Sequence, residues 1–200
     1  MQTRIEHDLL GAKEVPVDAY YGIHTLRAIE NFQISNVKIG QSPHFIRALG
    51  FVKKAAAQTN FYFQRITAQQ LAAIEYGADR LIEHPEKWAE SFPIDVYQGG
   101  AGTSVNMNCN EVIANIGLEF LGLNKGSYRE LHPNDHVNKS QSTNDVYPTA
   151  LRISLYQRLD DLLQVLADLI STIRLKADEY KFALKMGRTQ LQDAVPMTVG

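Results

Sequence analysis

Residues 155–173 read LYQRLDDLLQVLADLISTI, and the spacing of the apolar side chains in this stretch decides the fold class. Leucine or isoleucine recurs at alternating steps of four and three residues, at Leu155, Leu159, Leu162, Leu166, Leu169 and Ile173. This alternation is the period of helices that pack lengthwise in a bundle. We therefore expect a helix from about Pro148 to Lys181. Its apolar stripe needs other long helices to cover it, from other chains or from sequence outside this one.

Helical patterns also precede this stretch. One helix is expected from Pro43, a second after Thr67 as its N-cap, and a third from about Ser104 to Leu121. Residues 1–42 lack such periodicity and are expected to form loops, short strands and one or two helical turns. The prediction is a mainly α protein, with an α-rich N-terminal domain over residues 1–143. The beginning of a long central helical bundle follows over residues 144–200.

Composition and charge exclude several classes of function. The 200 residues include 20 Lys and Arg against 22 Asp and Glu, so no basic surface is expected for nucleic acid. The single cysteine, Cys109, excludes an internal disulfide. The first ten residues carry charges instead of a secretory apolar segment, and no run is long enough to cross a membrane. We expect a cytoplasmic protein with a small-molecule ligand.

Two segments place neutral polar residues where helices are expected to begin. Residues 96–110 read VYQGGAGTSVNMNCN, in which glycines let backbone amides approach a ligand and Thr103 and Ser104 open a helix. Residues 132–149 read HPNDHVNKSQSTNDVYPT, in which Ser140, Ser142, Thr143 and Asn144 precede the long helix. Neutral donors together with a helix dipole suit a carboxylate whose charge changes during a reaction. The alternative is helix capping, by Thr103 or Ser104 in the first segment and by Asn144 or Asp145 in the second.

A third polar segment, residues 185–196, reads KMGRTQLQDAVP. Gly187 is expected to end the long helix and Pro196 to begin another, with a polar connection between them. Arg188 could pair with a bound carboxylate or with Asp193.

A zinc site is not expected. His132 and His136 have the spacing of some metal ligands, but Pro133 follows the first histidine and no third ligand is evident.

In this order the three segments resemble the conserved regions of the fumarase/aspartase superfamily, whose members eliminate a group from a succinyl compound to give fumarate. The resemblance covers the whole chain. The matching segments are Arg4–Glu6, Val15–Pro16, Tyr20–Gly22, Thr25–Phe32, Gln98–Ser104, Ser140–Asp145 and Gly187–Ala194.

Within the superfamily the chain is most similar to the ammonia-lyase branch, the aspartases. Class II fumarases typically carry Ser-Ser-Asn where this chain has Ser142–Asn144, and a histidine at the position of Gln190. The resemblance implies that a base removes a Cβ proton from L-aspartate, giving an aci-carboxylate, and that ammonia then leaves to form fumarate. Class II fumarate hydratase and a non-catalytic helical assembly module are the alternative functions.

The resemblance also implies roles for particular residues. Thr103, Ser142 and Thr143 would donate hydrogen bonds to the β-carboxylate, and Asn144 would lie near the amino group. Thr189 would contact the α-carboxylate, with Gln190 close by. No cofactor and no metal site is implied, although a divalent cation could activate.

The general base of the family, a serine on a mobile loop, is expected beyond Gly200. No catalytic residue is therefore assigned within this chain, and the chain alone is expected to have negligible turnover. Family sites are assembled from three subunits, so a homotetramer is implied. A possible second carboxylate site, similar to one in class II fumarases, comprises Arg129, His132, Asn134 and Asp135. The alternative for these four residues is a structural turn.

Overall fold

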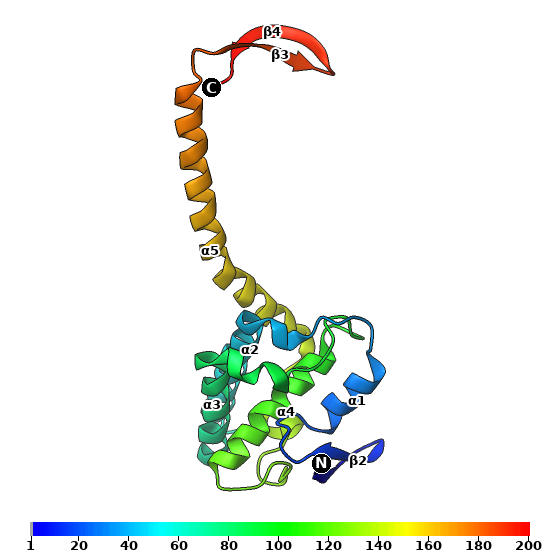
Figure 1. The fold of residues 1–200 in the computed structure, drawn as a ribbon. Helices are drawn as coiled ribbons and strands as arrows, with labels where there is room; N and C mark the ends of the chain where they lie inside the picture. Colours follow the sequence, from blue (N-terminus) through cyan, green and yellow to red (C-terminus); the bar gives the residue numbers. More distant parts are fainter. Residues whose placement is uncertain (1) are drawn as a thin grey trace. The chain divides into compact units, whose positions relative to one another are not determined.

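A computed structural model describes residues 2–200 and divides the chain into two compact units, the first ending at Leu155 and the second spanning Tyr156–Gly200. The elements of the first unit are β1 (Thr3–Asp8), β2 (Gly11–Pro16), α1 (Ile23–Asn31), η1 (Ile39–Gln41), α2 (Pro43–Tyr62), α3 (Ala68–Glu83), η2 (Pro85–Ser91), α4 (Thr103–Phe120), η3 (Pro133–Val137) and the start of α5 (Thr143–Glu179) (Figure 1). The elements of the second unit are the remainder of α5, β3 (Leu184–Thr189) and β4 (Gln192–Thr198). The predicted mainly α fold is confirmed.

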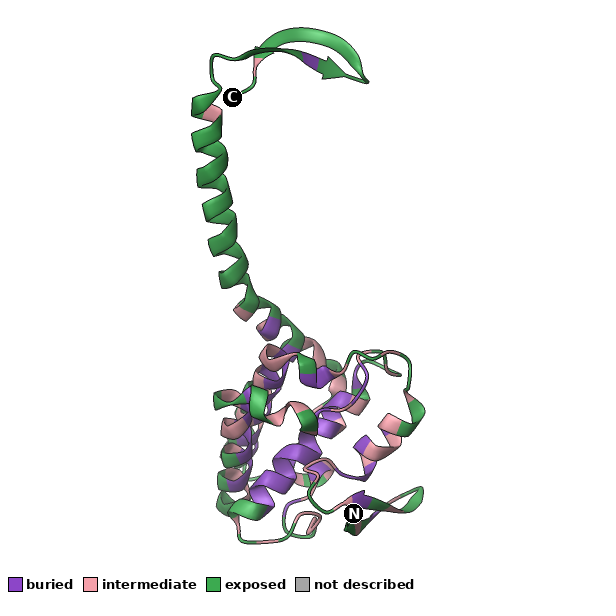
Figure 2. Ribbon diagram, in the orientation of Figure 1, coloured by how far each residue is buried: buried purple, intermediate pink, exposed green. Residues whose placement is uncertain are grey.

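The core of the first unit surrounds α4, which is buried along most of its length (Figure 2). The axes of α3 and α4 come close because two glycines carry no side chain at the contact. A Cβ on Gly77 would lie 2.8 Å from the Ile113 carbonyl oxygen, and one on Gly117 would lie 2.8 Å from that of Ala73. Substitution at either position would push the two helices apart.

The predicted starts of α2 and α3 are confirmed. Pro43 begins α2, where its missing N–H costs no hydrogen bond. Thr67 caps α3 through a reciprocal capping box with Gln70. The short strands expected in the N-terminal segment are β1 and β2, which pair antiparallel from Thr3–Pro16 to Asp8–Gly11. The helix α1, with nine residues, is slightly longer than the one or two turns expected.

The long helix α5 begins at Thr143, five residues before the expected start at Pro148. Pro148 therefore lies inside α5, where it has no backbone N–H to donate to the preceding turn. The side chains of the predicted stripe are exposed within this chain, from 41% at Leu166 to 56% at Leu155 and Ile173. The expectation of covering helices stays a prediction.

The expected helix after Pro196 is wrong. Residues 184–198 form an antiparallel hairpin, in which Pro196 lies in β4 opposite Met186 and the register shifts between Met186 and Arg188. Gly187 therefore lies at an irregularity of β3 and does not end α5, which stops at Glu179. Both strands of a two-stranded hairpin are edges, so proline and glycine fit there without losing a central ladder bond.

No helix among residues 2–200 is long and apolar enough to cross a membrane.

Candidate functional site

The glycine-rich loop sets the first turn of α4. Gly100 and Gly102 have φ of +68° and +87°, a left-handed backbone that glycine adopts without strain. The Gln98 side chain accepts the amide of Val105, with N and O 3.0 Å apart, and so supplies a cap for the helix. The expectation that Thr103 or Ser104 caps this helix is therefore wrong: Gly102 is the N-cap residue, and Thr103 is an exposed first helical residue.

The first turn of α5 lies against that of α4. A Cβ on Gly102 would lie 2.1 Å from the Tyr147 ring, so only glycine allows this contact. Tyr147 also packs edge-on against Phe45, with ring centroids 5.2 Å apart. The two helix starts are thereby fixed side by side in the first unit.

Ser142 caps α5. Its hydroxyl oxygen accepts the amide of Asn144 at 3.2 Å, and its carbonyl oxygen accepts the amides of Asp145 and Val146. The alternative of Asn144 or Asp145 as the cap is therefore wrong. Ser142 and Asn144 are exposed, and Thr143 is half-buried between them.

A hydrogen bond links the two predicted groups of carboxylate ligands. The Asn106 amide nitrogen donates to the Thr143 hydroxyl oxygen at 2.9 Å. Asn106 follows Thr103 by three residues, about one helical turn, so the predicted donors Thr103 and Thr143 lie on two helix starts that are hydrogen-bonded to each other. The arrangement gives amides, hydroxyls and two positive helix-dipole ends in one place, which suits an anion.

Behind these helix starts lies a buried cation that was not singled out from the sequence. Lys53 on α2 is 0% exposed, and its ammonium nitrogen donates to the side-chain oxygens of Asn138 and Gln141 at 3.0 Å each. Burial lowers the pKa of Lys53 to about 8. The signal was present in the pattern, because Lys53 sits four residues from both Leu49 and Ala57 on the buried stripe of α2.

Thr189 and Gln190 lie in the second unit. Thr189 ends β3 and pairs with Gln192, which leaves Gln190 and Leu191 as a two-residue turn. Both turn residues have positive φ, 48° and 65°, although neither is glycine. Such a turn stores backbone strain, which is common where side chains are held for function. Arg188 pairs with Asp193 at 3.2 Å, but both side chains are about two-thirds exposed and the pair contributes little to stability.

The four residues of the possible second site are not all in one place. His132, Asn134 and Asp135 line a cavity of about 600 Å³ together with residues of β1, its turn and α1. Arg129 lines a different hollow beside Gly126 and Tyr128. The His132 ring nitrogen Nδ1 accepts the amides of Asn134 and Asp135, which is the bonding of a structural turn.

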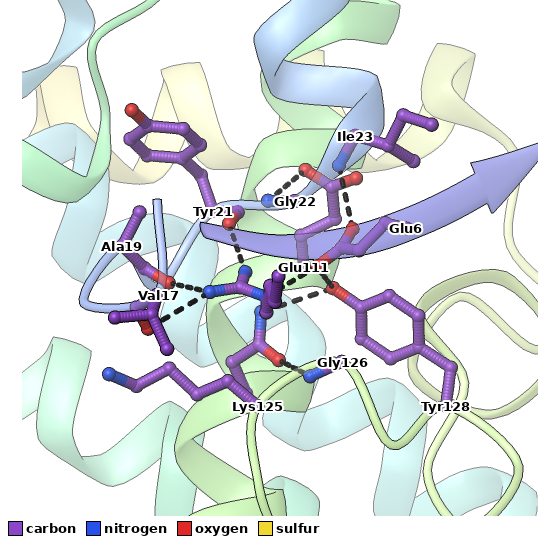
Figure 3. Close-up of polar contacts among 12 residues, drawn as sticks. Glu6, Val17, Ala19, Tyr21, Gly22, Ile23, Glu111, Lys125, Gly126 and Tyr128 are labelled. Atoms are coloured by element: carbon purple, nitrogen blue, oxygen red, sulfur yellow. Dashed lines mark hydrogen bonds and ion pairs between the residues drawn. The ribbon is translucent and has the colours of Figure 1, made fainter. Parts of the chain in front are cut away.

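Two buried carboxylates occupy the start of α1 (Figure 3). Glu111 accepts hydrogen bonds from the amides of Gly22, His24 and Thr25 and from the Thr25 hydroxyl, over 2.6–3.1 Å. Figure 3 shows the bond from the Gly22 amide. Glu6 accepts the amide of Ile23 at 2.8 Å. Burial raises the pKa of Glu111 to about 7 against the lowering effect of its donors. Neither carboxylate was assigned a role from the sequence, although Glu6 lies in the matching segment Arg4–Glu6.

Among residues 2–200 no group of three or more His, Cys, Asp or Glu side chains is placed to hold a metal ion.

The helical fold and the polar starts of α4 and α5 agree with the class of protein that the sequence resembled, the fumarase/aspartase superfamily. A family model described as Lyase matches residues 11–200, and the chain belongs to this family. Its predicted membership of the fumarase/aspartase superfamily is thereby confirmed.

Particular relatives narrow the comparison. Aspartate ammonia-lyase of Escherichia coli K12 is 58% identical over 98% of this chain, and that of Corynebacterium glutamicum is 53% identical over the same share. A fumarate lyase:delta crystallin structure from Brucella melitensis is 50% identical with a TM-score of 0.90, covering all of this chain and 46% of that one. The class II fumarase of Schistosoma mansoni is 35% identical with a TM-score of 0.83, over 99% of this chain and 41% of that one. The chain spans 41% of the E. coli enzyme and 37% of the C. glutamicum enzyme.

Proposed function

We propose that the whole protein is an aspartate ammonia-lyase, which eliminates ammonia from L-aspartate to give fumarate and catalyses the reverse addition. The observation that carries the proposal is the 58% identity, over 98% of this chain, to an aspartate ammonia-lyase. The neutral, hydroxyl-rich starts of α4 and α5 support it.

The Cβ proton of L-aspartate is only weakly acidic. The enzyme must therefore stabilise the carbanion that forms when this proton is removed. When that proton leaves, the β-carboxylate gains negative charge as an aci-carboxylate, and ammonia is then expelled from Cα. In this proposal Thr103, Ser142 and Thr143 donate to the β-carboxylate, where preorganised donors gain strength as the charge develops. Asn144 binds the amino group, Thr189 binds the α-carboxylate, and Gln190 lies near it. We assign no general base within this chain.

The test is the substrate preference of the whole protein. Purified protein is supplied with L-aspartate or with L-malate, and fumarate is followed by its ultraviolet absorbance. Formation of fumarate from L-aspartate supports the proposal. Formation from malate alone would instead identify a class II fumarate hydratase, the alternative favoured by the fold match to the S. mansoni fumarase.

Assembly and conditions are part of the proposal. We propose a homotetramer, supported by the exposed apolar stripe of α5. We also propose that the boundary between the two domains of each subunit lies near residues 143 and 144. Light scattering of the whole protein tests the tetramer, and an inactive protein that still assembles would point to the helical assembly module.

We propose a cytoplasmic enzyme that needs no cofactor and is activated by divalent cations, so EDTA should leave basal turnover and remove only the activation.

A second carboxylate site at Arg129, His132, Asn134 and Asp135 is also proposed, supported by the cavity that three of these residues line. Calorimetry should then show a second dicarboxylate-binding event that Arg129→Ala abolishes. A single binding event would leave the structural turn.

A further inference from the structure

The buried ammonium of Lys53 has only neutral neighbours. Among residues 2–200 it forms no ion pair, and its partners are the amide oxygens of Asn138 and Gln141. Cys109 lies near it, but burial raises the pKa of that thiol to about 12, so the thiol carries no countercharge. A buried, unpaired cation is costly and needs a reason.

The ammonium fixes the direction of the hydrogen bonds around it, because it can only donate. Asn138 must therefore turn its oxygen toward Lys53, and Gln141 must do the same. The Gln141 amide nitrogen donates to the carbonyl oxygens of Val137 and Lys139, which holds that orientation.

The direction of these hydrogen bonds is passed on from Asn138 to the start of α5. The same Asn138 oxygen lies 3.1 Å from the Asn106 amide nitrogen, so Asn106 must present its nitrogen there and not its oxygen. That nitrogen also lies 2.9 Å from the Thr143 hydroxyl oxygen. The Thr143 oxygen is therefore an acceptor in this bond, and its own proton is left free to donate elsewhere.

This orientation leaves the side-chain carbonyl of Asn106 without a hydrogen-bond partner. The Asn106 side-chain oxygen is buried and has no hydrogen-bond partner among the described residues. Rotating the amide by half a turn would bring that oxygen against the Asn138 oxygen, so that two acceptors would face each other. The unsatisfied oxygen is the smaller cost as long as Lys53 holds Asn138 in place.

We propose that Lys53, Asn138 and Asn106 are positioning residues that aim the Thr143 hydroxyl proton at a carboxylate bound at the start of α5. The inference rests on the proposed ammonia-lyase function. The bound dianion would also supply the negative charge that Lys53 lacks. Because the charge on the β-carboxylate grows in the transition state, the loss of this donor should fall on kcat more than on KM.

The test compares one substitution at three buried or half-buried asparagines of the whole protein. Asn106→Asp replaces the donor to Thr143 by an acceptor, so the Thr143 proton turns inward. Asn138→Asp keeps an acceptor facing both Lys53 and Asn106. Asn108→Asp is the matched control, since Asn108 is also buried on α4 but donates to the Ser91 carbonyl oxygen.

We expect Asn106→Asp to lower kcat for L-aspartate by about 100-fold with KM changed by less than about threefold, the size of a lost donor to developing charge. Asn138→Asp should lose no more than about threefold, and Asn108→Asp should lower the melting temperature without lowering kcat. Thr143→Val in the Asn106→Asp background should cost little more, because the donor is already gone.

Equal losses at positions 106, 138 and 108, or full additivity of Asn106→Asp with Thr143→Val, would overturn the inference while leaving the ammonia-lyase activity of the wild type intact. A wild type without activity on L-aspartate overturns the proposed function and this inference together. If Asn106→Asp does not fold, the kcat values of Asn138→Asp and Asn138→Leu for L-aspartate decide. A wild-type kcat in Asn138→Leu would contradict the proposal.

Discussion

The backbone amides at the starts of α1 and α5 need hydrogen-bond acceptors, and the two helices obtain them differently. At α1 the chain supplies its own carboxylates, and Glu111 accepts three amides and one threonine hydroxyl. At α5 the chain supplies serine and threonine hydroxyls, and Thr143 is turned by Asn106 so that its proton stays free. The first start is filled and 0% exposed at Glu111, whereas Ser142 and Asn144 at the second are exposed.

The comparison teaches what an anion meets at a helix start in this protein. The Glu111 carboxylate is held by amides and a threonine hydroxyl, as the proposed substrate carboxylate would be held at α5. The α1 start is thus an internal example of the binding mode, used for stability. The α5 start keeps the same kind of donors for a ligand, and draws their orientation from Lys53.

The largest expected effect is the loss of stability when Glu111 is removed from the start of α1. Glu111→Leu leaves three buried amides and a hydroxyl without their acceptor, and should lower the free energy of unfolding by about 4 kcal/mol. Urea denaturation followed by circular dichroism measures it. A loss below about 1 kcal/mol would show that water or another acceptor fills the α1 start, and the contrast with α5 would fail.

The next effect should appear in kinetics and not in stability. Thr143→Ala in the whole protein should lower kcat/KM for L-aspartate by about 3 kcal/mol of transition-state stabilisation, or about 100-fold, if Thr143 donates to the developing charge. Its melting temperature should change little, because Ser142 caps the helix. A change confined to the melting temperature would assign Thr143 a purely structural role.

A smaller effect separates the two threonines. Thr25→Val removes one charged hydrogen bond to Glu111 and should cost about 2 kcal/mol of stability, with unchanged kcat/KM. Thr25 and Thr143 would then show opposite profiles for the loss of the same hydroxyl. Denaturation and steady-state kinetics on the same preparations make the comparison, and a fall in kcat/KM without loss of stability would contradict it.

The smallest effect concerns pH. Because burial lowers the pKa of Lys53 to about 8, the ammonium is present below that pH and is lost as the pH rises through it. Without the obligatory donor, the orientation of Asn138 and Asn106 is no longer fixed. Succinate, whose carboxylates stay ionised throughout this range, should bind up to about threefold more weakly one pH unit above the pKa of Lys53, because most of the donor's effect falls on the transition state.

Calorimetry of succinate binding between pH 7 and 9 measures this effect, with Lys53→Met as the control. The variant should bind weakly at every pH in the range. A wild-type affinity independent of pH, or a Lys53→Met variant with the wild-type dependence on pH, would show that Lys53 does not orient Asn138 and Asn106.

Much of the fold followed from local patterns. The heptad-like stripe of α5, the Thr67 cap and the proline at the start of α2 are local signals, and all three elements formed where expected or within a few residues. The hairpin of β3 and β4 was missed because Gly187 and Pro196 have the same appearance in a helix connection and in an irregular two-stranded ribbon. Only pairing between strands distinguishes the two.

The candidate site was predicted as segments, and its internal connections were not. Motif wording identified Thr103, Ser142 and Thr143, but Asn106 and Gln98 gave no sign of which atom each would bond. Asn106 and Thr143 are 37 residues apart, and a hydrogen bond over that separation depends on how the helices pack, so sequence spacing does not specify it.

By itself the sequence determined the helical class, the family and the polar helix starts, since periodicity, capping residues and motifs act over a few neighbouring residues. The tertiary structure alone decided which polar groups are filled and which are free. It buried Glu111 against α1 and Lys53 behind α5, because burial and hydrogen-bond direction arise only when distant segments share one core.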